Sequence, residues 1–229
     1  MKQLIAGTTF TLLLLGGIQG PVGAASGGLS AVERAQLCVT EGSLQALSGT
    51  RLGVSDTKMR AYLGITTPAD VEAEIHYLGG TTKESRLGSG EIRRQLGLKL
   101  RAQDACNLVY VMWRIEPESK LVVSVKTNPG EHTSGECGNR GYRNVKARHS
   151  GPLPVLRPGD SHRLAARMHG SEVTVLIDGR PVWEGSVGPL SFDGPVGIRS
   201  DNARFEFALW ARIAGHQTAS CAAGAAGAD

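Results

Sequence analysis

Several signatures of common protein classes are missing from these 229 residues. After the first twenty residues no segment is apolar enough to span a membrane. Lysine and arginine are interspersed with carboxylates, so the basic block typical of nucleic-acid binding is absent. There is no Gly-x-Ser-x-Gly elbow, no phosphate-binding glycine loop, and no ligand spacing among the six histidines. The sequence therefore predicts no membrane span in the mature chain and no nucleic-acid partner, and nothing points to serine-hydrolase or transition-metal chemistry.

The N-terminus has the pattern of a secretory signal peptide. Lys2 supplies a positive start, Leu4 to Ile18 is an apolar run, and Val22-Gly-Ala24 is a small-residue cleavage site before Ala25. The alternative is a membrane anchor, but the run is short and Gly16-Gly17 interrupts it. We therefore expect residues 1–24 to be removed and the protein to be secreted or periplasmic.

Cysteine is scarce, with only four in the chain: Cys38, Cys106, Cys137 and Cys221. No two of them have the C-x-x-C spacing of a structural zinc site. An even number of cysteines in an exported protein favours disulfides, and four cysteines allow three connectivities.

Short alternating segments separated by Gly, Pro, Asp or Asn fill most of the chain. They are typical of an antiparallel β-sandwich, which we expect over residues 55–213. A capping-box spacing from Ser30 to Glu33 predicts a short helix over 31–37, within an N-terminal extension of residues 25–54. An Ala/Gly-rich tail follows over residues 214–229. The predicted strands are 57–63, 70–78, 92–101, 107–116, 120–127, 161–168, 172–177, 181–185, 195–199 and 204–212.

The segment from His162 to Trp210 carries the clearest resemblance. Its alternating run 162–168, the hairpin turn at Asp178-Gly179, the segment 194–202 and the closing run 204–210 follow one another in an order that resembles concanavalin A-like jelly rolls, the lectin, glucanase and laminin G-like group. This resemblance implies a two-sheet antiparallel sandwich whose first and last strands are neighbours. It also implies the disulfides Cys38–Cys221 and Cys106–Cys137, and a concave sheet face that holds a glycan or polysaccharide.

Four predicted strands, from 70–78 to 120–127, each present one apolar and one polar face. We expect their polar faces to form the glycan-binding surface of a non-catalytic, lectin-like domain; an ordinary solvated face is the alternative. The loop over 128–141 is long enough to rim this surface, or to be a tethered surface loop. The predicted ligand-binding residues are Glu74, His76, Gln95, Lys99, Tyr110, Arg114, Lys126, His132 and Arg140.

Two other functions remain open at this stage. Glu72, Glu74 and His76 share one strand face, and carboxylates two residues apart lie about 6.5–7 Å apart, near the separations used in glycoside hydrolysis. The Glu-x-Asp-x-x-Glu motif of related glucanases is not reproduced here, so a glycoside hydrolase or lyase is the second hypothesis. A protein-interaction module like many laminin G-like domains is the third. No cofactor is predicted, except that calcium remains open with Asp201 as its carboxylate ligand.

Overall fold

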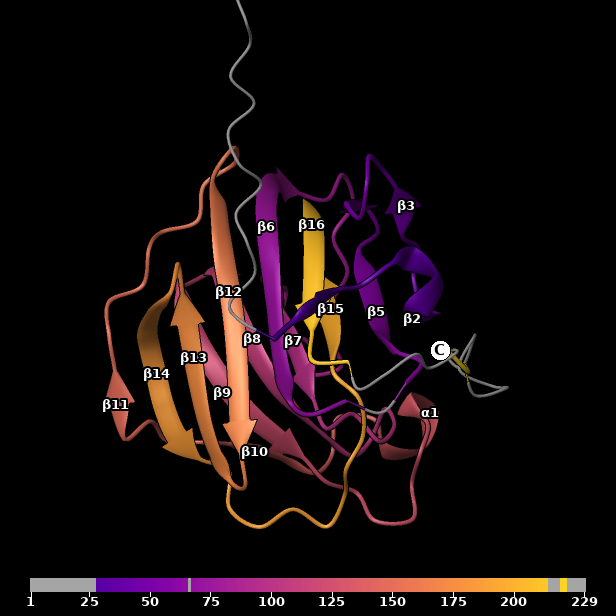
Figure 1. The fold of residues 1–229 in the computed structure, drawn as a ribbon, viewed down its shortest axis with the longest axis vertical. Coiled ribbons are helices and arrows are strands. Elements are labelled where there is room, and N and C mark those ends of the chain that lie inside the picture. Colours follow the sequence, from indigo (N-terminus) through magenta and orange to yellow (C-terminus); the bar gives the residue numbers. More distant parts are fainter. Residues whose placement is uncertain (1–27, 66, 214–218, 222–229) are drawn as a thin grey trace, which may run out of the picture.

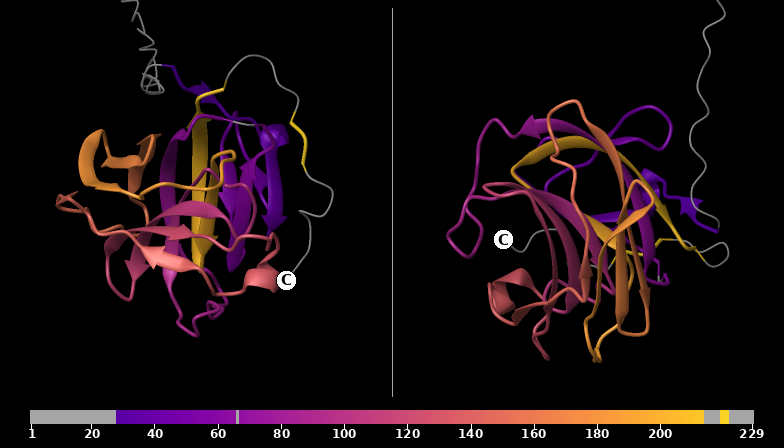
Figure 2. Two further views of the ribbon diagram at one scale, coloured as in Figure 1. Left: turned by 90° about the horizontal axis from the view of Figure 1, so that it is seen from below. Right: turned by 90° about the vertical axis from the view of Figure 1, so that its left-hand side faces the viewer.

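The computed structural model describes residues 28–65, 67–213 and 219–221. The expected signal peptide and most of the Ala/Gly-rich tail lie outside these residues. The described chain is an all-β sandwich of two antiparallel sheets, which confirms the predicted fold class. Figure 1 shows strands of one sheet in front of those of the other, and Figure 2 shows the sandwich from two further sides.

One sheet has nine strands, in the order β11-β14-β13-β12-β6-β16-β4-β3, with β1 also pairing with β16. Apolar and polar residues alternate along its long central strands, so each of these strands buries one face. Its strands are β1 (Ser30–Ala31), β3 (Gln45–Ala46), β4 (Leu52–Val54), β6 (Asp70–Gly80), β11 (His149–Ser150), β12 (Ser161–His169), β13 (Glu172–Ile177), β14 (Arg180–Ser186) and β16 (Ala203–Ala211).

The other sheet has seven strands, in the order β10-β9-β8-β7-β15-β5-β2. Its inner face contributes Leu96, Leu98, Val111 and Trp113 to the core that it shares with the nine-stranded sheet. Its strands are β2 (Leu37–Glu41), β5 (Lys58–Leu63), β7 (Arg94–Leu100), β8 (Leu108–Glu116), β9 (Lys120–Lys126), β10 (Tyr142–Asn144) and β15 (Gly197–Asp201).

Helical structure in the described residues is limited to two short elements. The 3-10 helix η1 (Arg34–Gln36) begins after Glu33, whose side chain forms a capping box with Gln36. The predicted helix over 31–37 is therefore shorter and capped one turn later, because Ser30–Ala31 pairs with β16 instead. The second element, α1 (Ser134–Cys137), lies in the 128–141 loop. No helix of the described chain is long and apolar enough to cross a membrane.

The predicted boundary between an N-terminal extension and the sandwich is wrong. Strands β1 to β4 fall within residues 25–54 and are hydrogen-bonded into the two sheets. Leu37, Leu52 and Val54 are buried in the common core. The sandwich therefore starts near residue 30: β2 and β4 bury apolar side chains that would otherwise face water, and β1 and β3 extend the sheet by pairing with β16 and β4.

Both predicted disulfides are present: Cys38–Cys221 and Cys106–Cys137. The prediction that four consecutive strands share one polar face is wrong, however. Strand β6 lies in the nine-stranded sheet, between β12 and β16, whereas β7, β8 and β9 lie in the seven-stranded sheet. The chain crosses from one sheet to the other after residue 80. The outward side chains of β6 are therefore on the opposite side of the sandwich from those of β7 to β9.

Candidate functional site

The outer face of the seven-stranded sheet, which we call the outer face below, collects five of the predicted ligand-binding residues. Because alternate residues point to opposite sides of a strand, the side chains opposite the core residues of β7, β8 and β9 share this face. They are Gln95, Lys99, Tyr110, Arg114 and Lys126.

The centre of the outer face is unusually well covered for a surface with no third layer of structure on it. Lys99 is 7% exposed, Tyr110 is 5% exposed and Lys126 is 3% exposed. Beside them Leu108 and Met112 pack with Tyr110 and Ala102 in a second, smaller apolar cluster. A solvated sheet face would leave such side chains open to water. The low exposure of these side chains therefore argues against an ordinary solvated face.

A buried carboxylate organises the charges of this face. Asp201, on β15, is fully buried; its Oδ1 accepts from Arg60 at 2.6 Å, and its Oδ2 accepts from Gln95 at 2.7 Å and from Arg199 at 3.2 Å. Burial alone would raise the pKa of Asp201, but the Arg199 and Arg60 guanidiniums hold it well below its usual range. The two carboxylate oxygens together already accept three hydrogen bonds, so Asp201 is poorly placed as a calcium ligand.

Two tyrosines form the aromatic part of the outer face. The rings of Tyr110 and Tyr142 stack with centroids 6.0 Å apart. The Arg199 guanidinium lies 4.7 Å from the Tyr110 ring centre, and the Lys126 ammonium lies 5.1 Å from that of Tyr142. Burial raises the pKa of Tyr110 to about 12, so its hydroxyl stays protonated at neutral pH. Tyr142 is 40% exposed and presents the accessible ring of the pair.

Lys99 differs from every other cation at the centre of this face. Among the described residues it has no hydrogen-bond or ion-pair partner. Burial, with the nearby positive charges of Arg60 and Arg199, lowers the pKa of Lys99 to about 7. Lys126, by contrast, donates to the carbonyl oxygens of Ala105 at 3.2 Å and Gly138 at 2.9 Å, and so ties the outer face to the 128–141 loop.

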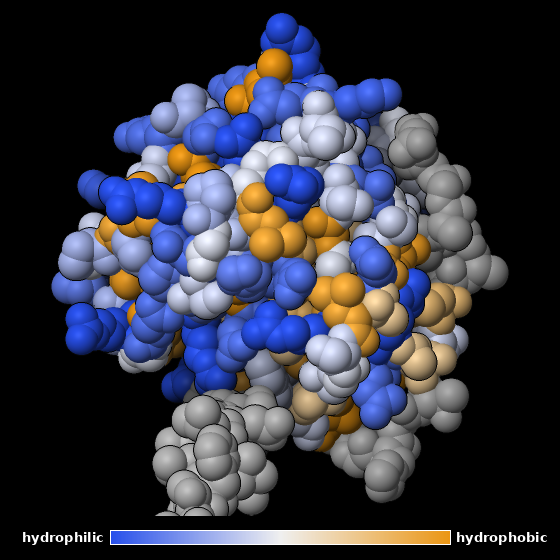
Figure 3. All heavy atoms as spheres, turned by 90° about the horizontal axis from the view of Figure 1, so that it is seen from above, coloured by the Kyte–Doolittle hydropathy of each residue, from blue (hydrophilic) through white to orange (hydrophobic). Residues whose placement is uncertain are grey.

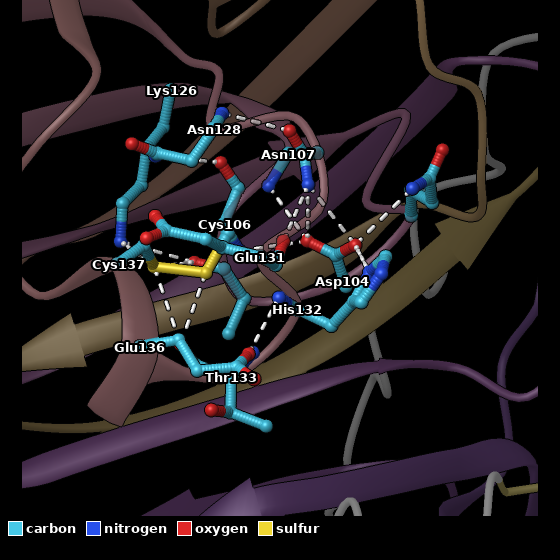
Figure 4. A network of polar contacts seen from close by, with 12 residues as sticks. Asp104, Cys106, Asn107, Lys126, Asn128, Glu131, His132, Thr133, Glu136 and Cys137 are labelled. Atoms are coloured by element: carbon cyan, nitrogen blue, oxygen red, sulfur yellow. Dashed lines mark hydrogen bonds and ion pairs between the residues drawn. A yellow bond between two sulfur atoms is a disulfide. The ribbon is translucent and has the colours of Figure 1, made fainter.

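The 128–141 loop is held by a network centred on Asp104, shown in Figure 4. Asp104 Oδ1 accepts from the backbone N–H groups of Cys106 and Asn107, both at 2.8 Å. The Asn107 side chain in turn bonds the loop at the carbonyl of Glu131 and the N–H of Asn128. With the Cys106–Cys137 disulfide, these bonds make the loop an ordered structure beside the sheet.

The two predicted ligand residues of the loop, His132 and Arg140, are exposed but already partnered. His132 Nδ1 lies 2.8 Å from Asp104, and this contact raises the pKa of His132. Arg140 pairs with Glu131 at 2.6 Å. Both side chains therefore help to hold the loop as well as lining its surface.

The remaining candidates lie on the outer side of the nine-stranded sheet, away from the outer face. Glu72 and Glu74 pair with the same guanidinium, that of Arg163, at 3.1 Å each. His76 Nδ1 is 2.9 Å from the Ser161 hydroxyl. Glu74 and His76 therefore cannot join Lys99 and Tyr110 in one site. A catalytic site built from Glu72, Glu74 and His76 would therefore lie on the nine-stranded sheet, on the opposite side of the sandwich from the outer face.

Sequence reasoning missed Arg60, Arg199 and Tyr142. Arg60 on β5 and Arg199 on β15 each lie between two buried residues, so the same period-two pattern could have placed them on an outward face. It could not have placed them beside Lys99, since that depends on β15 lying between β5 and β7. Tyr142 is on a three-residue strand, which is too short for alternation to reveal.

Comparison with known proteins supports the fold. A scan of family models found no match, and a search of curated proteins found none. Among solved structures, the chain is similar to the carbohydrate-binding module CBM66 from Bacillus subtilis (TM-score 0.50, 16% identity, 76% of this chain and 92% of that one). It is also similar to a putative glycosyl hydrolase from Parabacteroides distasonis (TM-score 0.52, 8% identity, 80% of this chain and 90% of that one). At such identities these likenesses establish a shared β-sandwich fold, and the site must be judged on its own residues.

Proposed function

We propose that this protein is an exported, non-catalytic carbohydrate-binding domain of the concanavalin A-like superfamily, which holds a glycan on its outer face. One observation carries the proposal: the outer face gathers hydrogen-bonding and charged side chains around a stacked tyrosine pair. Sugar hydroxyls are bound by such planar polar groups, and the C–H faces of a sugar ring pack on an aromatic ring. The fold likeness to CBM66 supports the same class of ligand.

Tyr142 is the residue on which a sugar ring would stack. It is one of the few large hydrophobic side chains exposed in the described chain, and Tyr110 supports it from behind. The stapled 128–141 loop, with His132 and Arg140, forms the rim at one end of the same face. Export is supported by the two disulfides, which persist in oxidising compartments, and by the predicted signal peptide.

A glycan array with the disulfide-bonded protein tests this function. We expect binding to a defined set of glycans, and we expect Tyr142→Ala to weaken it about tenfold or more, as loss of a stacking ring does. The matched control is Trp210→Ala, which removes a partly exposed aromatic ring that packs under Arg163 on the nine-stranded sheet. A blank array, or equal losses in the two variants with unchanged melting temperatures, would contradict the proposal.

A hydrolase acting through Glu72 and Glu74 is the less favoured function. Both carboxylates are tied to Arg163, and the acid that protonates a leaving group would have to give up that pair. A protein-docking module finds little support on the side seen in Figure 3, where small groups of hydrophobic residues are separated by hydrophilic ones. Capture of a protein partner together with a blank array would favour this third function.

A further inference from the structure

The unpartnered ammonium of Lys99 is the starting point. Its side chain is 7% exposed, and no described residue offers it a hydrogen bond or an ion pair. An isolated charge in such a place is costly unless an opposite charge compensates it. The neighbouring cations are compensated: Arg60 and Arg199 bind Asp201, and Lys126 binds two carbonyl oxygens.

The groups that surround Lys99 leave an excess of positive charge. Arg60 on β5 and Arg199 on β15 face it as cations, and Glu41 on β2 and Asp201 on β15 face it as anions. Tyr110 on β8 is its neighbour across the strand pair and is neutral. Glu41 pairs with Arg60 and Lys58, and Asp201 pairs with Arg60 and Arg199, so neither acid is left over for Lys99.

We propose that the glycan held on the outer face is acidic, and that Lys99 binds its anionic group, a carboxylate or a sulfate. This inference rests on the proposed function and narrows its ligand class. The three N–H donors of the ammonium suit the oxygens of one such group. Charge-assisted bonds in a poorly solvated place are also stronger than neutral ones. Arg60 and Arg199 strengthen the local positive potential without giving up their bonds to Asp201.

A second cationic position on the same face would receive a further acidic sugar of the chain. Arg114 lies four residues from Tyr110 along β8, which corresponds to about 13 Å. Its buried Nε has no hydrogen-bond partner in the described part of the chain, and it lines a surface cavity of about 380 Å³. Of the other charged residues of this cavity, Arg93 pairs with Glu91 and Lys120 pairs with Glu118, which leaves the Arg114 charge uncompensated. The outer face therefore presents unpaired donors at two points along one line.

Calorimetry with matched acidic and neutral ligands tests the inference. The ligands are oligogalacturonate with its carboxyl-reduced counterpart, and dextran sulfate with dextran. We expect the wild-type protein to bind one acidic member about tenfold to a hundredfold more tightly than its neutral partner, the gain of a charged hydrogen bond. The two pairs distinguish a carboxylate from a sulfate. We expect Lys99→Met to lose the preference and Lys99→Arg to keep it.

The pH dependence separates Lys99 from general charge attraction. Only the ammonium form binds an anion, so wild-type affinity should fall as the pH rises above 7, whereas Lys99→Arg should stay level from pH 6 to 9. The control is Arg167→Met, since Arg167 is exposed and lies on β12 of the nine-stranded sheet, away from the outer face. If neutral glycans bind as well as acidic ones, or Arg167→Met weakens binding as much as Lys99→Met, the acidic ligand is refuted while glycan binding stands. If no glycan binds, both proposals fail.

Discussion

At the scale of single residues, the buried charge of Lys99 destabilises the folded state. Its pKa is near 10.5 in an unfolded chain and about 7 in the folded protein, where burial and two arginines disfavour the charge. The unfolded state therefore binds more protons between pH 7 and pH 10, and the stability of the protein rises with pH across this interval. At or below pH 7 the full penalty applies, on the order of 3–5 kcal/mol by the conversion of pKa to free energy.

Replacing Lys99 by methionine should stabilise the protein. A methionine of similar length keeps the apolar stem and removes the buried charge, so we expect Lys99→Met to raise the melting temperature by several degrees at pH 7. The difference in melting temperature between the two proteins should narrow toward pH 10, because the pH then approaches the pKa of the lysine in the unfolded chain and its discharge on folding costs less. Thermal unfolding followed by circular dichroism from pH 6 to 10 measures it, with Lys120→Met as the control that should change little. A lower melting temperature for Lys99→Met at pH 7 would contradict this reasoning.

At the scale of elements, alternation in the sequence predicts the strands well. The ten predicted strands coincide with β5 to β9 and β12 to β16 to within about three residues, because core-facing apolar residues alternate along each of them with residues of the other face. What the pattern cannot encode is the partner of each strand. β6 pairs with β12 and β16, more than 80 residues further along the chain, and so Glu74 was grouped with residues on the other side of the molecule.

The same limit applies to the candidate site. Gln95, Lys99 and Tyr110 could be placed together because β7 and β8 are consecutive and adjacent. Asp201 and Arg199 could not be placed beside them, since β15 enters the sheet from nearly 100 residues away. The pairing of Asp201 with Arg60 and Arg199, for the same reason, has no signal in the sequence, where Asp201 is only an open calcium candidate. The sequence pattern predicts which side chains of one strand share a face, but it does not predict which distant strands lie side by side.

The 128–141 loop offers a test at this scale. Asp104→Ala removes the acceptor of two backbone N–H groups and the partner of His132. We expect faster hydrogen exchange at residues 104–107 and 131–133, and a loss of about 1–3 kcal/mol in the free energy of unfolding. The pKa of His132 should fall toward its ordinary value, as an NMR titration would measure.

The control for this loop experiment is Asp193→Ala, because Asp193 also accepts a backbone N–H bond, from Gly194 at 2.9 Å, but its side chain is 72% exposed and lies outside the 128–141 loop. Hydrogen exchange at residues 104–107 and 131–133 should be unchanged in that variant. Unchanged exchange in Asp104→Ala would mean that the disulfide alone orders the loop.

At the scale of the whole molecule, the two disulfides constrain different parts of the sandwich. Cys38 is on β2, the edge strand of the seven-stranded sheet, and its bond to Cys221 joins residues 183 apart in the chain. Cys106 and Cys137 are 31 residues apart, and their bond holds the loop beside the outer face. The first bond closes the domain as a whole, and the second secures one end of the candidate site.

These positions predict that the two disulfides differ in their effects on stability and on glycan affinity. Loop-closure entropy assigns about 5 kcal/mol to the longer cross-link and about 4 kcal/mol to the shorter one. We therefore expect the double variant Cys38→Ser/Cys221→Ser to lose more stability in urea unfolding than Cys106→Ser/Cys137→Ser does. Glycan affinity should behave in the opposite way: below the unfolding transition it should persist in the first variant and fall in the second, whose 128–141 loop loses its covalent link to Cys106 beside β8. Equal losses of affinity in two folded variants would place the ligand away from this loop, and an intact affinity in the second variant would confine the site to the sheet itself, around Lys99 and Tyr142.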